Sequence, residues 1–134
     1  MAERDQAGRQ AMGVQDLDAF REACSVFGDE GALAHLRRFR QDLAEHLRWI
    51  GQGQPDQVAL AKMAHKTAGR SGVLGFPALA DACAGLEEAV RARRGVAAAL
   101  DHWKQQARLA AEAPRGNADA IASGEKTADV LARR

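Results

Sequence analysis

Apolar residues recur at intervals of three and four along most of this chain, which is the spacing of one helix face. In the first such segment, an apolar stripe is formed by Leu17, Phe20, Cys24 and Phe27, and Gly28 can end the helix. This pattern predicts a short helix that packs as a lid on the elements that follow.

A longer amphipathic helix is predicted over residues 29–50, and Asp29 is placed to cap its start. The apolar positions of this helix are Leu33, Leu36, Phe39, Leu43, Leu47 and Ile50. Arg40 interrupts the stripe with a charge. The run GQGQP that follows has the composition of a turn.

A third helix is predicted from Pro55, which suits a first helical turn, to Leu74. Gly75 then fits a left-handed helix end, and Pro77 fits the first turn of a fourth helix. The fourth helix ends in the run RARRG, whose arginines suit the negative end of the helix dipole.

A fifth helix is predicted over residues 96–112, and helices two to five are joined by very short turns. Neighbouring helices joined in this way run antiparallel, so we expect an all-α fold. The expected arrangement is an antiparallel up-and-down four-helix bundle with a short additional N-terminal helix, over residues 14–112. Residues 1–13 are expected to be a flexible leader, and residues 113–134 a disordered or marginally helical tail.

Composition supports the all-helical prediction and excludes some classes of function. Aromatic residues make up only 4% of the 134 residues, which favours helices over a β-sandwich. The formal net charge of +1 argues against a nucleic-acid-binding protein. The absence of a long apolar run predicts a cytoplasmic protein without a membrane partner.

Cys24 and Cys83 lie within apolar segments and are expected to be buried, reduced thiols.

The third predicted helix turns a histidine, His65, toward solvent. An α-helix turns about 100° per residue, so a helical wheel shows which residues lie opposite His65. They are Leu60, Met63, Thr67, Ser71 and Leu74. This face is therefore expected to join the core.

The residues that surround His65 on the exposed face are unusually small. They are Ala61, Ala68, Gly69 and Gly72. Each glycine in a helix costs about 1 kcal/mol relative to alanine, and close helix packing does not explain Gly69 and Gly72 because they lie away from the core face. We predict that this access platform leaves room for an external body, or for a bulky group on the imidazole.

Basic side chains border the platform. Lys62 and Lys66 lie on one flank of His65, and Arg70 lies further round toward the core. The same spacing occurs on ordinary solvated helix faces. Beside an exposed histidine it also suits the stabilisation or docking of a phosphoryl group.

The run AHKTAGRSGVLGFPALADACAGLE, residues 64–87, resembles the signature of histidine-containing phosphotransfer (HPt) domains of bacterial two-component phosphorelays. The residues that carry the resemblance are His65, Gly69, Ser71, Gly72, Gly75 and Leu86-Glu87. Many family members carry leucine and lysine where this chain has Thr67 and Ala68, so Lys62, Lys66 or Arg70 would have to meet the phosphoryl charge.

The resemblance implies a monomeric signal-transduction carrier whose phosphoacceptor is His65. A receiver domain with a phosphorylated aspartate and Mg²⁺, or a hybrid histidine kinase, would donate the phosphoryl group, and a second receiver would take it. The chain itself would need no cofactor and no metal. Two alternatives stay open: an HPt-like docking module that inhibits a receiver or kinase without being phosphorylated, and a helical adaptor whose resemblance is accidental.

Overall fold

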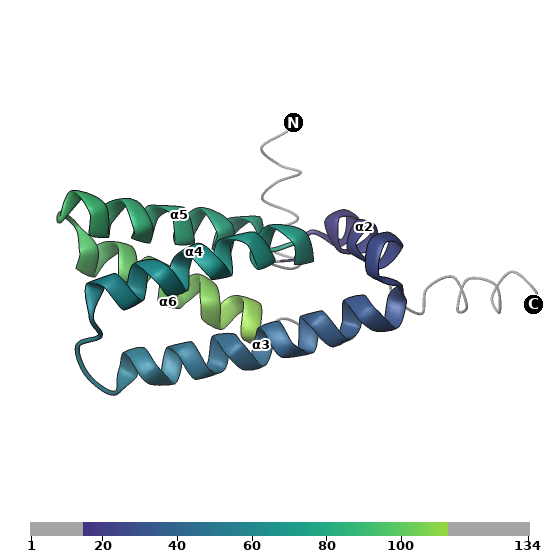
Figure 1. Ribbon diagram of the computed structural model, residues 1–134, viewed down its shortest axis with the longest axis horizontal. Helices are drawn as coiled ribbons and strands as arrows, with labels where there is room; N and C mark the ends of the chain where they lie inside the picture. The colour runs from purple at the N-terminus through teal and green to yellow at the C-terminus, as the bar shows by residue number, and fades with distance from the viewer. Residues whose placement is uncertain (1–14, 113–134) are drawn as a thin grey trace, which may run out of the picture.

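The computed structural model describes residues 15–112, which contain five α-helices and no β-strand (Figure 1). The helices are α2 (Leu17–Phe27), α3 (Asp29–Gly51), α4 (Gln57–Leu74), α5 (Pro77–Ala92) and α6 (Val96–Glu112). The all-helical prediction is confirmed. The predicted leader at 1–13 and tail at 113–134 lie outside the described residues.

The start of α3 differs from the prediction. Asp29 does not cap this helix: Gly28 occupies the capping position, and no side chain makes a cap hydrogen bond there. Gly28 has a φ of 78°, so the chain reverses direction at a residue without a Cβ. Asp29 lies in the first turn of α3, where its negative charge still suits the positive end of the helix dipole.

The ends of α4 are set by local side chains and by one glycine. Pro55 lies before α4 and not in its first turn, because Asp56 caps the helix by accepting a hydrogen bond from the backbone N–H of Ala59. Gly75 ends α4 in the left-handed conformation, and Pro77 is the first residue of α5. Both of these sequence predictions are confirmed.

The helices pack around one apolar core. Contacts link α3 with α4, α4 with α5, α5 with α6 and α6 with α3, and α2 packs on α3 and α4 at one end of the molecule (Figure 1). The largest fully buried apolar side chains are Trp103, Phe20, Phe39, Phe76, Leu36, Leu43, Leu60, Leu79 and Leu86. No described helix has the length and apolar character needed to span a membrane.

Both cysteines are free thiols, and only one is buried. The Cys83 sulfur accepts a hydrogen bond from the Trp103 indole, with 3.2 Å between Nε1 and Sγ. Burial raises the pKa of Cys83 to about 11, so this thiol stays protonated and unreactive at neutral pH. Cys24 is only half-buried, so the prediction of burial is wrong for it.

Phe27 is a second exception to the predicted core. This residue is 46% exposed, whereas Phe20 and Ala23 are the buried residues of α2. The reason is that α2 ends at Gly28, so its last turn lies at the edge of the core. The Phe27 ring lies against the His35 ring there, with centroids 4.8 Å apart.

Candidate functional site

The imidazole of His65 projects from the middle of α4 into solvent, as the wheel predicts. Its side chain is 79% exposed. The whole predicted core face is buried: Leu60, Met63, Thr67, Ser71 and Leu74. His65 therefore lies on a face of α4 that the other helices within residues 15–112 leave exposed.

The buried face of α4 contains two hydroxyl side chains, and both are hydrogen-bonded within the helix. Thr67 Oγ1 donates to the carbonyl of Met63, and Ser71 Oγ donates to the carbonyl of Thr67, each over 2.7 Å. Both side chains thus satisfy their polar atoms within their own helix and lie in the core without an unpaired donor.

A carboxylate from α5 holds the imidazole. Glu87 Oε2 lies 3.2 Å from His65 Nδ1, and the Glu87 side chain is 34% exposed. An ionised carboxylate only accepts hydrogen bonds, so Nδ1 carries the proton in this pair. In a neutral ring the lone pair then lies on Nε2, which is the nitrogen farther from Glu87.

The sequence indicated Glu87 as part of a signature but assigned it no role. A usable signal is present: Gly75 marks the turn between α4 and α5, and His65 and Glu87 lie ten residues before it and twelve after it. Antiparallel helices joined by a tight turn bring such positions to the same level along their axes. The sequence does not specify how α5 is rotated about its axis, and this rotation decides whether Glu87 faces His65.

The access platform is open, as predicted. Gly69 and Gly72 are exposed, and a Cβ added to either would meet no heavy atom of the described residues within 4 Å. Neither glycine is therefore required by packing inside the domain. Ala61 and Ala68 are half-buried and complete the platform beside His65.

The three basic residues predicted to border the platform differ in their interactions in the structure. Lys62 and Lys66 are exposed and form no ion pair within residues 15–112. Arg70 is anchored on α3 instead. Its Nη1 lies 2.7 Å from Asp42 Oδ2, and its guanidinium carbon lies 5.1 Å from the centroid of the Phe39 ring.

Asp42 forms a second ion pair, with Arg38, whose Nε lies 3.2 Å from Asp42 Oδ1. Partial burial by itself would raise the pKa of Asp42. The hydrogen bonds and positive charges of Arg70, and then of Arg38, outweigh that effect and hold the pKa below its usual value. The pair thus fixes Arg70 against α3 at neutral pH.

This lowered pKa gives a testable pH dependence. A carboxyl group with a lower pKa in the folded state stabilises the fold above its unfolded pKa, about 3.9, and loses that contribution as the pH falls through the native value. Solvent screening limits the gain, so Asp42→Asn should lower the free energy of unfolding at pH 7 by roughly 0.5 to 1 kcal/mol. At a pH below the native pKa of Asp42, the variant and the wild type should be equally stable.

Urea unfolding at both pH values measures this effect. Asp101→Asn is the matched control, because Asp101 is itself exposed, forms a longer pair with Lys104 and should contribute little to stability. An equal loss from Asp42→Asn at both pH values would contradict the electrostatic explanation.

No set of three or more histidine, cysteine, aspartate or glutamate side chains within residues 15–112 is arranged to hold a metal ion. The chemical groups assembled here are one exposed imidazole, one carboxylate beside it and two exposed lysines that form no ion pair within residues 15–112. Such a surface can offer a nucleophilic nitrogen to another molecule.

Comparison with known proteins gave one match. A family described as Hpt domain matches residues 30–113, which is more than half of the chain. The matched region contains both His65 and Glu87 and begins after α2. No curated protein and no solved structure matched the chain.

Proposed function

This chain belongs to the Hpt domain family, which acts in phosphotransfer of two-component signalling, and we propose that His65 is the phosphoacceptor of a phosphorelay carrier. The donor is the phosphoaspartate of a receiver domain, or a hybrid histidine kinase, and a second receiver takes the group onward. The observation that carries this proposal is the exposed His65 ring held through Nδ1 by Glu87.

The proposed step follows from that hydrogen bond. The lone pair of Nε2 attacks the phosphorus of the aspartyl phosphate, so a P–N bond forms. The bond between phosphorus and the aspartate oxygen breaks, and the electron pair leaves with the carboxylate. Nδ1 keeps its proton, and the ring gains positive charge that the Glu87 carboxylate at 3.2 Å offsets. The reverse step passes the group to the next receiver.

The surroundings of His65 support the entry of a second protein. We propose that Lys62 and Lys66 meet the negative charge of the phosphoryl group, while Arg70, which is held by Asp42, contributes less directly. The platform residues that let the receiver approach are Ala61, Ala68, Gly69 and Gly72. Mg²⁺ is expected in the receiver and not in this chain.

We also propose how the five helices are arranged. Contacts between successive helices support an up-and-down bundle of α3, α4, α5 and α6 with α2 added. We propose that the chain works as a cytoplasmic monomer and binds neither nucleic acid nor membranes.

A second candidate function is a docking module that binds a receiver or kinase and is not phosphorylated. The observation in its favour is Ala68, which stands where many family members have a lysine. The family match rules out the third hypothesis, in which the resemblance is accidental.

Label transfer separates the two candidates. A panel of receiver domains is phosphorylated with labelled acetyl phosphate and Mg²⁺, freed of donor and mixed with the chain. The carrier acquires label that resists alkali and is lost in acid, as expected of a phosphorus–nitrogen bond to imidazole. Receiver binding without label would favour the docking module, and a chain that neither binds nor gains label would contradict both.

The role of Glu87 can be tested separately. Glu87→Ala should lower the transfer rate about ten-fold or more, because the ring loses the acceptor that holds the proton on Nδ1. Nitrogen NMR of His65 should then show a mixture of both neutral tautomers in place of one. Glu87→Gln keeps a hydrogen-bond acceptor and should recover part of the rate. An unchanged tautomer in Glu87→Ala would show that Glu87 does not orient the imidazole.

A further inference from the structure

Three arginines surround the turn between α5 and α6, at the end of the molecule away from α2 (Figure 1). Arg91 lies in the last turn of α5, and Arg93 and Arg94 follow that helix. All three are exposed. Arg91 forms an ion pair with Glu88, whereas Arg93 and Arg94 form none within residues 15–112. We call Arg91, Arg93 and Arg94 the arginine turn.

Fold stability does not explain the arginine turn. The favourable effect of a cation on a helix C-terminus falls off within the last helical turn, which contains only Arg91. Arg93 has a φ of 54° and is the one non-glycine residue with a positive φ within residues 15–112. Glycine adopts this conformation more easily than a residue with a Cβ, so folding alone favours glycine at position 93. A costly backbone conformation at an exposed, charged residue points to a functional position.

Backbone hydrogen bonds fix the two arginines that follow α5. The N–H of Arg93 donates to the carbonyl of Val90 over 3.2 Å, and the N–H of Arg94 donates to the carbonyl of Ala89 over 3.1 Å. Both arginine side chains therefore start from a fixed backbone. Only their own rotation is restricted when they bind an anion, which lowers the entropic cost of that contact.

The arginine turn is within reach of a protein that docks on His65. Glu87 contacts His65, and α5 ends at Ala92, five residues after Glu87. This separation is about 8 Å along the helix. A protein contact of standard size covers about 800 Å² per partner, which corresponds to a radius of roughly 16 Å. A receiver centred on His65 therefore extends to the arginine turn.

Basic side chains also lie between His65 and the arginine turn. Lys62 lies three residues before His65 on α4, and Arg91 lies four residues after Glu87 on α5. The helices α4 and α5 pack against each other and are joined by a tight turn, so Lys62 and Arg91 lie at about the same level along the two axes. Positive charge therefore continues from the phosphoacceptor to the end of α5.

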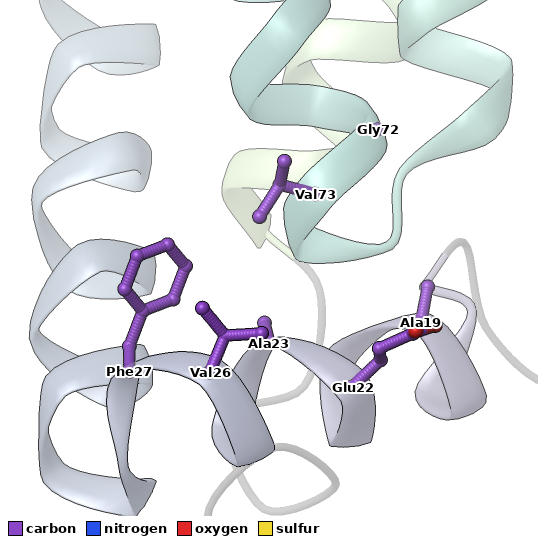
Figure 2. Close-up of a pocket in the computed structure, with 7 residues that line it drawn as sticks. All are labelled: Ala19, Glu22, Ala23, Val26, Phe27, Gly72 and Val73. Atoms are coloured by element: carbon purple, nitrogen blue, oxygen red, sulfur yellow. The ribbon is translucent and has the colours of Figure 1, made fainter.

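The surface on the other side of His65 is apolar. A hollow of about 380 Å³ lies between α2 and the last turns of α4, and its lining includes Val26, Phe27 and Val73 (Figure 2). Glu22 is the single charged residue among the described residues that line it. The lining of the hollow therefore contributes no cation, and the charge around His65 is asymmetric.

We propose that the arginine turn is a docking site for carboxylate side chains of the partner receiver and selects among receivers by their charge. This inference rests on the proposed carrier function. A receiver holds its Mg²⁺ through carboxylates, so it presents acidic groups around its phosphoaspartate. Arginine binds carboxylates through paired N–H groups. Receivers with further aspartate or glutamate opposite the arginine turn associate faster, and those with lysine or arginine there are repelled.

An anionic membrane is a less suitable partner for the same arginines. Segments that bind anionic lipids carry clusters of roughly four to eight basic residues. The arginine turn has three arginines, and Arg91 is already paired with Glu88. A docked receiver needs fewer charges, because contacts around His65 hold it at the same time.

The test uses a double variant, Arg93→Gly with Arg94→Gln, and a matched control, Arg108→Gln. Arg93→Gly removes a charge and also relieves the positive φ, so the double variant should be about as stable as wild type in urea unfolding. Arg108 is exposed on α6, which does not pack against α4. Transfer from a panel of labelled receivers is measured against receiver concentration, at about 0.05 M and about 0.5 M salt. Each protein is also treated with phosphoramidate, a small donor that phosphorylates histidine without any docking protein.

For receivers that donate to the wild type, the double variant should raise the receiver concentration for half-maximal transfer about ten-fold at low salt. At high salt the difference should shrink to less than about two-fold, because salt screens exposed charges. The rate at saturating receiver and the labelling by phosphoramidate should stay within about two-fold of wild type, because His65 and Glu87 are unchanged. Arg108→Gln should match the wild type in every measurement.

Three results would overturn the inference. They are unchanged receiver dependence of the double variant at low salt, an equal effect of Arg108→Gln, and an effect that high salt does not reduce. Sedimentation with phosphatidylserine vesicles is a further test. Vesicle binding by the wild type that is lost in the double variant, without a change in transfer, would assign the arginine turn to a membrane.

Failure of the carrier function would give a different result. Absence of label at His65 from receivers and from phosphoramidate alike would contradict the carrier function itself. Phosphoramidate labelling without transfer from any receiver would contradict receiver docking.

Discussion

His65→Gln is expected to abolish phosphoryl transfer to this chain, with a loss of at least about 10³-fold relative to wild type. The reason is chemical, because a glutamine amide nitrogen has no available lone pair with which to attack phosphorus. The substitution should leave the fold intact, since the side chain is 79% exposed and hydrogen-bonds to the partly exposed Glu87. Glutamine can still hydrogen-bond to that carboxylate.

Labelling from phosphorylated receivers, followed by gel separation and acid or alkali treatment, measures the effect. His35→Gln and His102→Gln are matched controls on other helices, and both should retain full labelling. Circular dichroism of His65→Gln should match the wild type. If His65→Gln still gained acid-labile label, the phosphoacceptor would be a different histidine, and the role assigned to His65 would be wrong.

Gly75→Ala is expected to have the largest effect on stability, a loss of about 3 kcal/mol. Its φ of 91° lies in the left-handed region, which costs a residue with a Cβ about 1 to 2 kcal/mol. A Cβ there would also overlap the backbone carbonyl of Asp16. Moving Asp16 away would break its N–H bond to the carbonyl of Gly75 and the bond from Gln15 Nε2 to the carbonyl of Leu74.

Thermal and urea unfolding test this expectation, and the melting temperature should fall by roughly 10 to 20 °C. Gly72→Ala is the matched control three residues earlier. Its Cβ would meet open space inside a helix, so this variant should gain about 0.5 to 1 kcal/mol. Equal stability of Gly75→Ala and wild type would show that α2 can move away from Gly75 without loss.

These two glycines illustrate how far the sequence leads. The left-handed turn at Gly75 was predictable because Gly-Phe-Pro is a local signal, read from a few adjacent residues. The close approach of Asp16 to the same glycine was not predictable, because it depends on how α2 packs against a segment about 60 residues away. Gly72 was correctly expected to lie on the surface, since helix periodicity decides which face a residue occupies.

The sequence by itself determined the helices, the buried face of α4 and the exposure of His65, because hydrogen bonding and rotation within a helix are local properties. Tertiary packing decided which side chains meet between helices. It placed Glu87 on the imidazole of His65 and turned Arg70 toward Asp42. The apolar hollow between α2 and α4 likewise exists only because two helices distant in sequence lie together, and no periodicity within either one specifies that distance or angle.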